Sequence, residues 1–117
     1  MKVKVGCDIV EIKRFNKLDS KILNKIFHRN ELKNLKAESL AGLFAAKESC
    51  KKVFNDLNCH DIEIKKKRNG RPLLILKKNK DVLNYDLSIS HDGGYAIATV
   101  VFLIKDRVHK RHSSKKP

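Results

Sequence analysis

The sequence lacks the features that mark several common protein classes. It has no tryptophan, and aromatic residues make up only 6% of its 117 residues, which weighs against nucleic-acid binding through stacked aromatic side chains. Its three cysteines, Cys7, Cys50 and Cys59, are widely spaced and odd in number. They argue against a disulfide scaffold or a zinc knuckle and favour a reducing compartment. The longest apolar run, Tyr95–Ile104, has ten residues, which is too short for a membrane helix.

The first residues also lack the continuous apolar stretch of a signal peptide. Residues 1–6 alternate between apolar and other side chains, and Asp8 and Glu11 follow soon after. This pattern is not that of a secretory leader. We therefore expect a soluble, cytoplasmic protein with no membrane partner.

Acidic residues are scarce beside the basic ones. The chain has 13 Asp and Glu against 27 Lys and Arg, a formal net charge of +14. Such an excess favours polyanionic partners, which include nucleic acid, acidic protein faces, anionic lipid and phosphorylated small molecules. A small basic nucleic-acid-binding protein therefore stays open as an alternative to an enzyme with phosphorylated or acidic substrates.

The length and composition favour one folded domain. Hydrophobic residues make up 41% of the chain, enough for a modest core. From Lys105 onward the composition becomes strongly basic, and Val108 is the only apolar residue beyond Ile104. We expect a single domain at 1–106 and a basic, mobile C-terminal tail at 107–117.

Periodicity predicts an α+β fold, with an N-terminal strand, several helices and then an antiparallel β meander. In the strand at 2–10, Val3, Val5, Cys7 and Ile9 share one face. The expected helices are 11–18, a second capped by Asp19 or Ser20, a third at 31–36 capped by Asn30, and a long one at about 39–54 capped by Ser39. The later elements are strands at 61–67, 73–76, 86–91 and 95–104, a turn at 69–72 and a helical turn at 79–83.

Four short segments carry candidate chemistry, and each has a simpler interpretation. Asp8 is a poor strand former and would do equally well on a solvated strand face. Glu48 and Lys52 are four residues apart, the spacing of an ordinary surface ion pair on a helix. The segment Asn69–Pro72 could simply be a hairpin turn, and Ser90 and His91 could simply finish a strand and start a turn.

Taken together and in order, the segments Gly6–Arg14, Phe44–Lys52, Asn69–Pro72 and Leu87–His91 resemble a known family. It is the small bacterial, holo-[acyl-carrier-protein] synthase type of the 4′-phosphopantetheinyl transferase superfamily. The resemblance covers residues 2 to about 103. Its most specific parts are the strand with the aspartate and the helix with the Lys-Glu pair.

The resemblance implies a reaction and a metal. Such enzymes transfer the 4′-phosphopantetheine arm of coenzyme A to a serine hydroxyl of apo acyl carrier protein, releasing adenosine 3′,5′-bisphosphate, and they require Mg²⁺. Asp8 and Glu48 match the metal-binding carboxylates, in keeping with the preference of Mg²⁺ for a few carboxylate oxygens completed by water and phosphate. Lys52 matches a lysine that acts on the pyrophosphate or the leaving group. A metal-bound water or a carboxylate such as Glu48 could accept the serine proton.

The resemblance also implies binding surfaces and an assembly. An acidic carrier protein and coenzyme A suit a cationic enzyme, and the family forms homotrimers with active sites between subunits, so part of the apolar strand surface at 87–104 should be an interface. The residues that match coenzyme A contacts are Lys47, Lys52, Asn69, Gly70, Arg71, Pro72, Ser90 and His91, and those expected to bind the carrier are Arg14, Lys21, Ile22 and Lys25.

The chain departs from the family pattern at two places. Leu43 stands where many relatives have an arginine, so a phosphate contact is either missing or supplied by another residue such as Lys51 or Arg71. The segment after Lys52 contains no glycine, although a glycine-rich stretch is usual there. A non-catalytic relative that only binds the carrier is a further alternative, against which Asp8 and Glu48 argue together with Lys52.

Overall fold

The structure is a computed structural model that describes residues 1–106. The predicted tail at 107–117 lies outside the described residues. In chain order the elements, with η for a 3₁₀ helix, are β1 (Lys2–Glu11), η1 (Ile12–Phe15), α1 (Ser20–Ile26), η2 (Arg29–Lys33), α2 (Ala37–Val53), η3 (Cys59–Asp61), β2 (Ile62–Lys66), β3 (Pro72–Leu76), β4 (Val82–Asp92) and β5 (Tyr95–Ile104). The predicted α+β order is confirmed.

The strands divide between two antiparallel sheets rather than one continuous meander. The larger sheet has the order β1-β5-β4, and β2 and β3 form a separate hairpin. β1 therefore pairs with the last strand, and Asp8 lies opposite Ala98. β4 and β5 are joined by Gly93 and Gly94, whose positive φ angles of 56° and 83° suit a tight two-residue turn.

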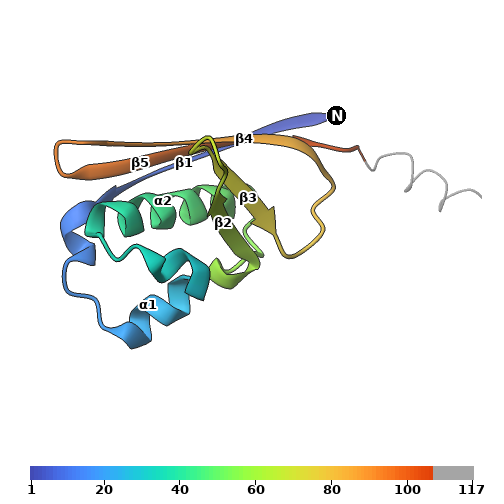
Figure 1. The fold of residues 1–117 in the computed structure, drawn as a ribbon. Coiled ribbons are helices and arrows are strands. Elements are labelled where there is room, and N and C mark those ends of the chain that lie inside the picture. The colour runs from blue at the N-terminus through green and yellow to red at the C-terminus, as the bar shows by residue number, and fades with distance from the viewer. Residues whose placement is uncertain (107–117) are drawn as a thin grey trace, which may run out of the picture.

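Helix α2 packs along one face of the larger sheet, and α1 lies on the far side of α2 (Figure 1). The buried side chains of α2 are small, and Ala41, Ala45 and Ala46 are fully buried. Small side chains let the helix approach the sheet closely. Phe27 and Phe102 fill the larger spaces of the same core, each adding about 2–3 kcal/mol through apolar burial.

The two faces of β1 are used differently from what alternation alone suggests. Gly6 and Val10 are buried under α2, so they and Asp8 face the helix. Val3, Val5 and Ile9 remain 60–65% exposed on the opposite face of the sheet. The stripe predicted from its apolar character therefore points away from the core of the single chain.

Two helix starts differ from the prediction. The third helix is the 3₁₀ turn η2, capped by His28 rather than Asn30, and its capping box is completed by Glu31. The long helix starts at Ala37, and Ser39 lies inside it, accepting a hydrogen bond from Asn34 (3.1 Å). A capping box stabilises the earlier turn because it satisfies two backbone N–H groups at once.

The remaining local differences are small. The predicted helix at 11–18 is only the 3₁₀ turn η1, whereas the Asp19 cap of α1 is confirmed by its bond from Ile22 N (2.9 Å). The predicted helical turn at 79–83 is wrong, because the Asn79 carboxamide accepts from the backbone N–H of Asp81 (2.9 Å), whose φ is 57°. β4 then begins at Val82, four residues earlier than predicted. None of the helices within residues 1–106 is long and apolar enough to cross a membrane.

Candidate active site

Asp8 and Lys52 form the first part of the candidate site. The Lys52 Nζ atom lies 3.3 Å from Asp8 Oδ1 and donates to the carbonyl oxygen of Cys7 (2.7 Å). The Asp8 side chain is 20% exposed and that of Lys52 is 57% exposed. The structure therefore joins two predicted residues that are far apart in the sequence, with the carboxylate held against α2 and the ammonium group open to solvent.

The close contact between β1 and α2 positions this pair. Ser49 Oγ lies 2.7 Å from the carbonyl oxygen of Ala45 and 3.0 Å from that of Ala98, the residue opposite Asp8. Ser49 is fully buried, so these contacts fix the helix against the strand beside Asp8. A polar residue in this interface is accommodated because its hydroxyl is hydrogen-bonded.

Glu48 lies one helical turn before Lys52, so both side chains belong to the same face of α2. Its carboxylate is 30% exposed and accepts a hydrogen bond from Lys51 (2.9 Å), which raises the pKa of Lys51. Both candidate metal-binding carboxylates are thus partly exposed and each has a lysine beside it. Each of these two carboxylates therefore already attracts a positively charged group.

The donor chemistry of Asp8 and Glu48 suits Mg²⁺. Within residues 1–106, no three His, Cys, Asp or Glu side chains gather into a potential metal cluster. Mg²⁺ needs no such cluster, since it commonly takes one or two carboxylates and completes its shell with water and substrate phosphate. The two carboxylates fit this mode of binding.

Lys47 does not suit the phosphate contact predicted for it. Its side chain is fully buried, and its ammonium group contacts Glu31 Oε1 (2.9 Å) and the carbonyl oxygens of Cys59 (2.9 Å) and Ile62 (2.6 Å). Burial lowers the pKa of Lys47, and the Glu31 carboxylate opposes that shift. Three acceptors use all three N–H groups of this lysine, so the prediction is corrected to a role inside the fold.

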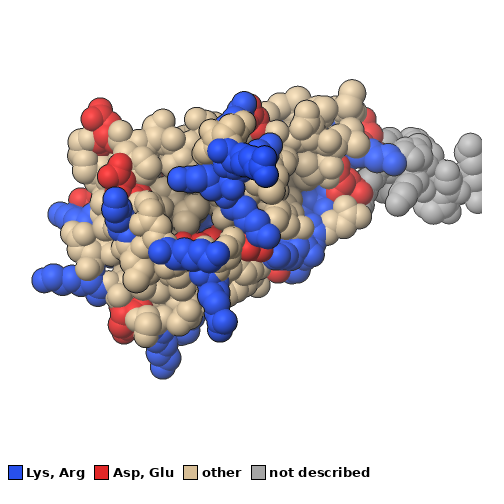
Figure 2. All heavy atoms as spheres, viewed as in Figure 1, with Lys and Arg blue, Asp and Glu red and all other residues tan. Residues whose placement is uncertain are grey.

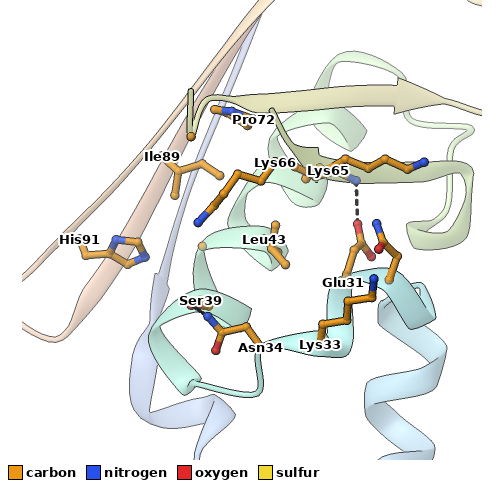
Figure 3. A pocket seen from close by; sticks show the side chains of 14 residues that line it. Glu31, Lys33, Asn34, Ser39, Leu43, Lys65, Lys66, Pro72, Ile89 and His91 are labelled. Atoms are coloured by element: carbon orange, nitrogen blue, oxygen red, sulfur yellow. Dashed lines mark hydrogen bonds between the residues drawn. The ribbon is translucent and has the colours of Figure 1, made fainter. Parts of the chain in front are cut away.

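A cavity of about 650 Å³ lies between α2, η2, the β2–β3 hairpin and β4. Three of the predicted coenzyme A contacts, Gly70, Pro72 and His91, line it. Figure 3 shows Leu43 on its floor and Lys66 reaching across it on the side of His91. The other lining residues are Asn30, Glu31, Lys33, Asn34, Ser39, Gly42, Ile64, Lys65 and Ile89.

Besides Lys47 and Lys52, three predicted coenzyme A residues do not line this cavity. Asn69 accepts from the backbone N–H of Arg71 (3.0 Å), and the Arg71 guanidinium lies 3.3 Å from Asp86 on the exposed surface. Ser90 is exposed and points to the opposite face of the sheet from its neighbour His91. Ser90 and His91 therefore lie on opposite faces of the sheet within one protomer.

The cations around the cavity were only partly foreseen from the sequence. Of the two residues proposed to replace the missing arginine at Leu43, Lys51 contacts Glu48 and Arg71 contacts Asp86. Lys33, Lys65 and Lys66 line the cavity instead. Lys65 and Lys66 belong to the basic run just before the hairpin turn, which was visible in the sequence. Figure 2 shows Lys and Arg side chains gathered around a hollow on this face.

The residues predicted to bind the carrier lie on η1 and α1. The Arg14 guanidinium sits over the Phe44 ring, 5.6 Å from its centroid. Lys21 and Lys25 are exposed on α1, and Ile22 is 42% exposed beside them. A basic surface with an apolar centre suits an acidic protein partner.

Comparisons with known proteins identify the family of this chain. The chain matches the 4′-phosphopantetheinyl transferase superfamily over residues 4–100. It therefore belongs to this superfamily and is an enzyme of the phosphopantetheinyl transferase class.

Within the superfamily, the chain is similar to proteins named holo-[acyl-carrier-protein] synthase. The one from Campylobacter hominis is 40% identical over 118 residues, which cover 83% of this chain and 94% of the relative. The one from Helicobacter pylori is 38% identical over 112 residues, with the same coverage of both chains.

Solved structures of proteins with this name share the fold. The Helicobacter pylori enzyme in complex with coenzyme A has a TM-score of 0.77 and 35% identity, covering 86% of this chain and 100% of its own. The Bacillus anthracis enzyme in complex with coenzyme A (3′,5′-ADP) has a TM-score of 0.74 and 33% identity, covering 86% of this chain and 96% of its own.

Proposed function

We propose that the chain transfers the 4′-phosphopantetheine arm of coenzyme A to a serine hydroxyl of apo acyl carrier protein, in a Mg²⁺-dependent reaction that releases adenosine 3′,5′-bisphosphate. The observation that carries this proposal is the meeting of Asp8 with Lys52, at 3.3 Å, one helical turn from Glu48. Carboxylates beside an exposed ammonium group suit a reaction in which a metal and a lysine share a pyrophosphate. The names of the similar proteins support the same carrier and the same donor.

Asp8 and Glu48 would hold the Mg²⁺ ion. When bound, the metal neutralises negative charge on the pyrophosphate of coenzyme A. Lys52 Nζ would exchange its present bond to the Cys7 carbonyl oxygen for a phosphate oxygen and so stabilise the departing bisphosphate. The Glu48 carboxylate lies on the same helix face and would accept the proton of the attacking serine hydroxyl.

The cavity would receive the nucleotide end of coenzyme A. Its volume of about 650 Å³ lies within the usual range for ligand sites. Apolar side chains such as Leu43 and Ile89 suit the adenine face, and the surrounding lysines suit phosphate. None of Asp8, Glu48 and Lys52 lines this cavity, so one protomer does not place both parts of the site in one hollow.

A homotrimer would unite these two parts, with the cavity of one protomer facing the carboxylates of the next. The sheet face opposite α2 is a candidate interface, because Val5, Ile9 and Val101 are 37–60% exposed there without any covering element in residues 1–106. Exposed apolar stripes of this kind commonly mark subunit contacts. The proposal therefore includes an active site shared between subunits.

The proposed reaction can be tested by intact-mass measurement. Apo acyl carrier protein is incubated with the enzyme, coenzyme A and Mg²⁺, and a parallel sample contains a chelator. We expect the carrier to gain the mass of one phosphopantetheine arm only when free Mg²⁺ is present. A folded enzyme that modifies none of several carriers would contradict the proposal.

A further inference from the structure

One buried ion pair joins three walls of the cavity. Glu31 on η2 and Lys47 on α2 lie 2.9 Å apart, and both side chains are fully buried. Lys47 also donates to the backbone carbonyl oxygen of Ile62 (2.6 Å) at the start of β2. The pair therefore connects η2, α2 and β2, the segments that surround most of the cavity.

Glu31 uses both of its carboxylate oxygens in this arrangement. Oε1 accepts from Lys47 and from the backbone N–H of His28 (2.7 Å), and Oε2 accepts from the backbone N–H of Ile64 (2.8 Å). The dashed line in Figure 3 marks this contact between Glu31 and β2. Only a side chain with two acceptor oxygens can accept from the backbone N–H groups of both His28 and Ile64. A glutamine in place of Glu31 has one oxygen, so its NH₂ group would face one of these N–H groups.

The pair lies at the cavity wall, with Glu31 in the lining and Lys47 outside it. Glu31 and Ile64 belong to its lining, and the bond between them fixes the separation of those two walls. Leu43, on the cavity floor, is one helical turn before Lys47 on the same face of α2. A change at the ion pair would therefore move these walls of the cavity relative to one another.

We propose that Glu31 and Lys47 are positioning residues that hold the cavity at the width required to bind the nucleotide end of coenzyme A. The inference rests on the proposed function, since it assigns that ligand to the cavity. Burying a charged pair seldom adds more stability than well-packed apolar residues of similar volume would. Apolar residues could not make the polar contacts that fix the cavity walls, so we assign the charged pair to positioning these walls.

Variants of the ion pair separate an effect on cavity geometry from an effect on stability. Glu31→Gln leaves the Lys47 charge buried without its partner, so we expect a marked fall in melting temperature. In Glu31→Gln/Lys47→Met the uncompensated charge is gone, and much of the melting temperature should return. The carboxamide of this double variant can accept from only one of the His28 and Ile64 backbone N–H groups, so the connection between η2 and β2 is still weakened, and its Kd for adenosine 3′,5′-bisphosphate, measured by calorimetry, should rise by about tenfold or more. Its kcat at saturating coenzyme A should stay within about twofold of the wild-type value.

Glu63→Gln is the matched control. Glu63 neighbours Ile64 on β2, is also buried and pairs with Lys77 (2.8 Å), but it does not line the cavity. This variant should bind the bisphosphate as the wild type does. If Glu31→Gln does not fold, Glu31→Asp keeps the charge and both oxygens on a shorter side chain, and it should still weaken binding.

The outcomes distinguish this inference from the proposed function. If the wild-type protein neither binds the bisphosphate nor modifies the carrier, the proposed function has failed. If the wild type does both, and ligand affinity in the variants recovers together with melting temperature, Glu31 and Lys47 have only a structural role and the inference is overturned. Weakened affinity in the thermally recovered double variant, with Glu63→Gln unchanged, supports it.

Discussion

Gly6 and Ser49 touch through their backbones. A Cβ atom added to Gly6 would lie 2.0 Å from the carbonyl oxygen of Ser49 and 3.2 Å from a methyl carbon of Val53. No rotation of a side chain can relieve the first contact, because the obstructing atom belongs to the backbone of α2. The absence of a side chain at Gly6 thus brings β1 close enough to α2 for Asp8 to meet Lys52.

Gly6→Ala should therefore damage both stability and activity. The added methyl group must push β1 and α2 apart, and we expect a loss of about 2–3 kcal/mol in the free energy of unfolding, measured with urea. Transfer activity should fall by more than the unfolded fraction explains, because the Asp8–Lys52 contact is lost. Variant protein that is fully folded by circular dichroism isolates the effect on activity.

Gly93→Ala is the control for Gly6→Ala. Gly93 has a positive φ of 56°, but a Cβ atom there would meet nothing within 4 Å, so only local backbone strain of about 1 kcal/mol is expected. Its activity should match that of the wild type. Equal damage from the two substitutions would contradict the role assigned to the Gly6 contact.

Much of the fold could be predicted because it depends on local periodicity. The strand at 95–104 was predicted with the observed bounds, and the long helix within about two residues of them. The face of β1 that packs on α2 was not predictable, since Val3 and Val5 are more apolar than Gly6 and Asp8 and yet remain exposed. Which face of a sheet receives the helix depends on small residues that permit close approach, and hydropathy does not report this.

Residue type and order in the chain were enough to group Asp8, Glu48 and Lys52 as candidates. The structure brings Asp8 to Lys52 and places Glu48 one helical turn from Lys52, while their roles remain proposals. Lys47 was misjudged because its burial depends on Glu31 and on carbonyl groups 12 and 15 residues further along. The cavity lysines, such as Lys66, could not be assigned because folding of the hairpin over α2 decides which members of a basic run face inward.

The carboxylates and Lys52 should affect activity in different ways. Asp8→Asn and Glu48→Gln keep the side-chain shape but remove negative charge, and each should lower kcat/KM by about 100-fold or more and raise the Mg²⁺ concentration required. Lys52→Met should lower kcat by a similar factor at saturating Mg²⁺. Steady-state kinetics over a Mg²⁺ titration distinguish the two effects. Glu11→Gln, at the exposed end of β1, is the control, and near-normal kinetics in Asp8→Asn would refute its role as a ligand.

The pair formed by Glu63 and Lys77 should make stability depend on acid pH. The hydrogen bond from Lys77 lowers the pKa of Glu63 below its usual value of 4.5. A carboxylate with a lowered pKa in the folded protein stabilises it above the unfolded pKa, and this contribution is lost as the pH falls through the folded pKa. Urea unfolding should therefore show a gap between wild type and Glu63→Gln that is largest near neutral pH and shrinks as the pH falls well below 4.5. A gap independent of pH would show that the ion pair is not its cause.

The exposed face of the larger sheet should control assembly. Val5 lies in the middle of β1 on that face and is 60% exposed. Val5→Lys would bury a charge in the proposed trimer interface, which costs several kcal/mol without a partner, so sedimentation velocity should show monomers where the wild type forms trimers. Activity should fall together with assembly, because the cavity and the carboxylates would no longer meet.

Leu35→Lys provides the matched control for this substitution. Leu35 is 64% exposed, similar to Val5, but it lies between η2 and α2, away from the sheet. This variant should remain trimeric and active although it carries the same added charge. A wild-type protein that is monomeric yet fully active would exclude the shared site, and a Val5→Lys monomer with full activity would place the whole reaction within one protomer.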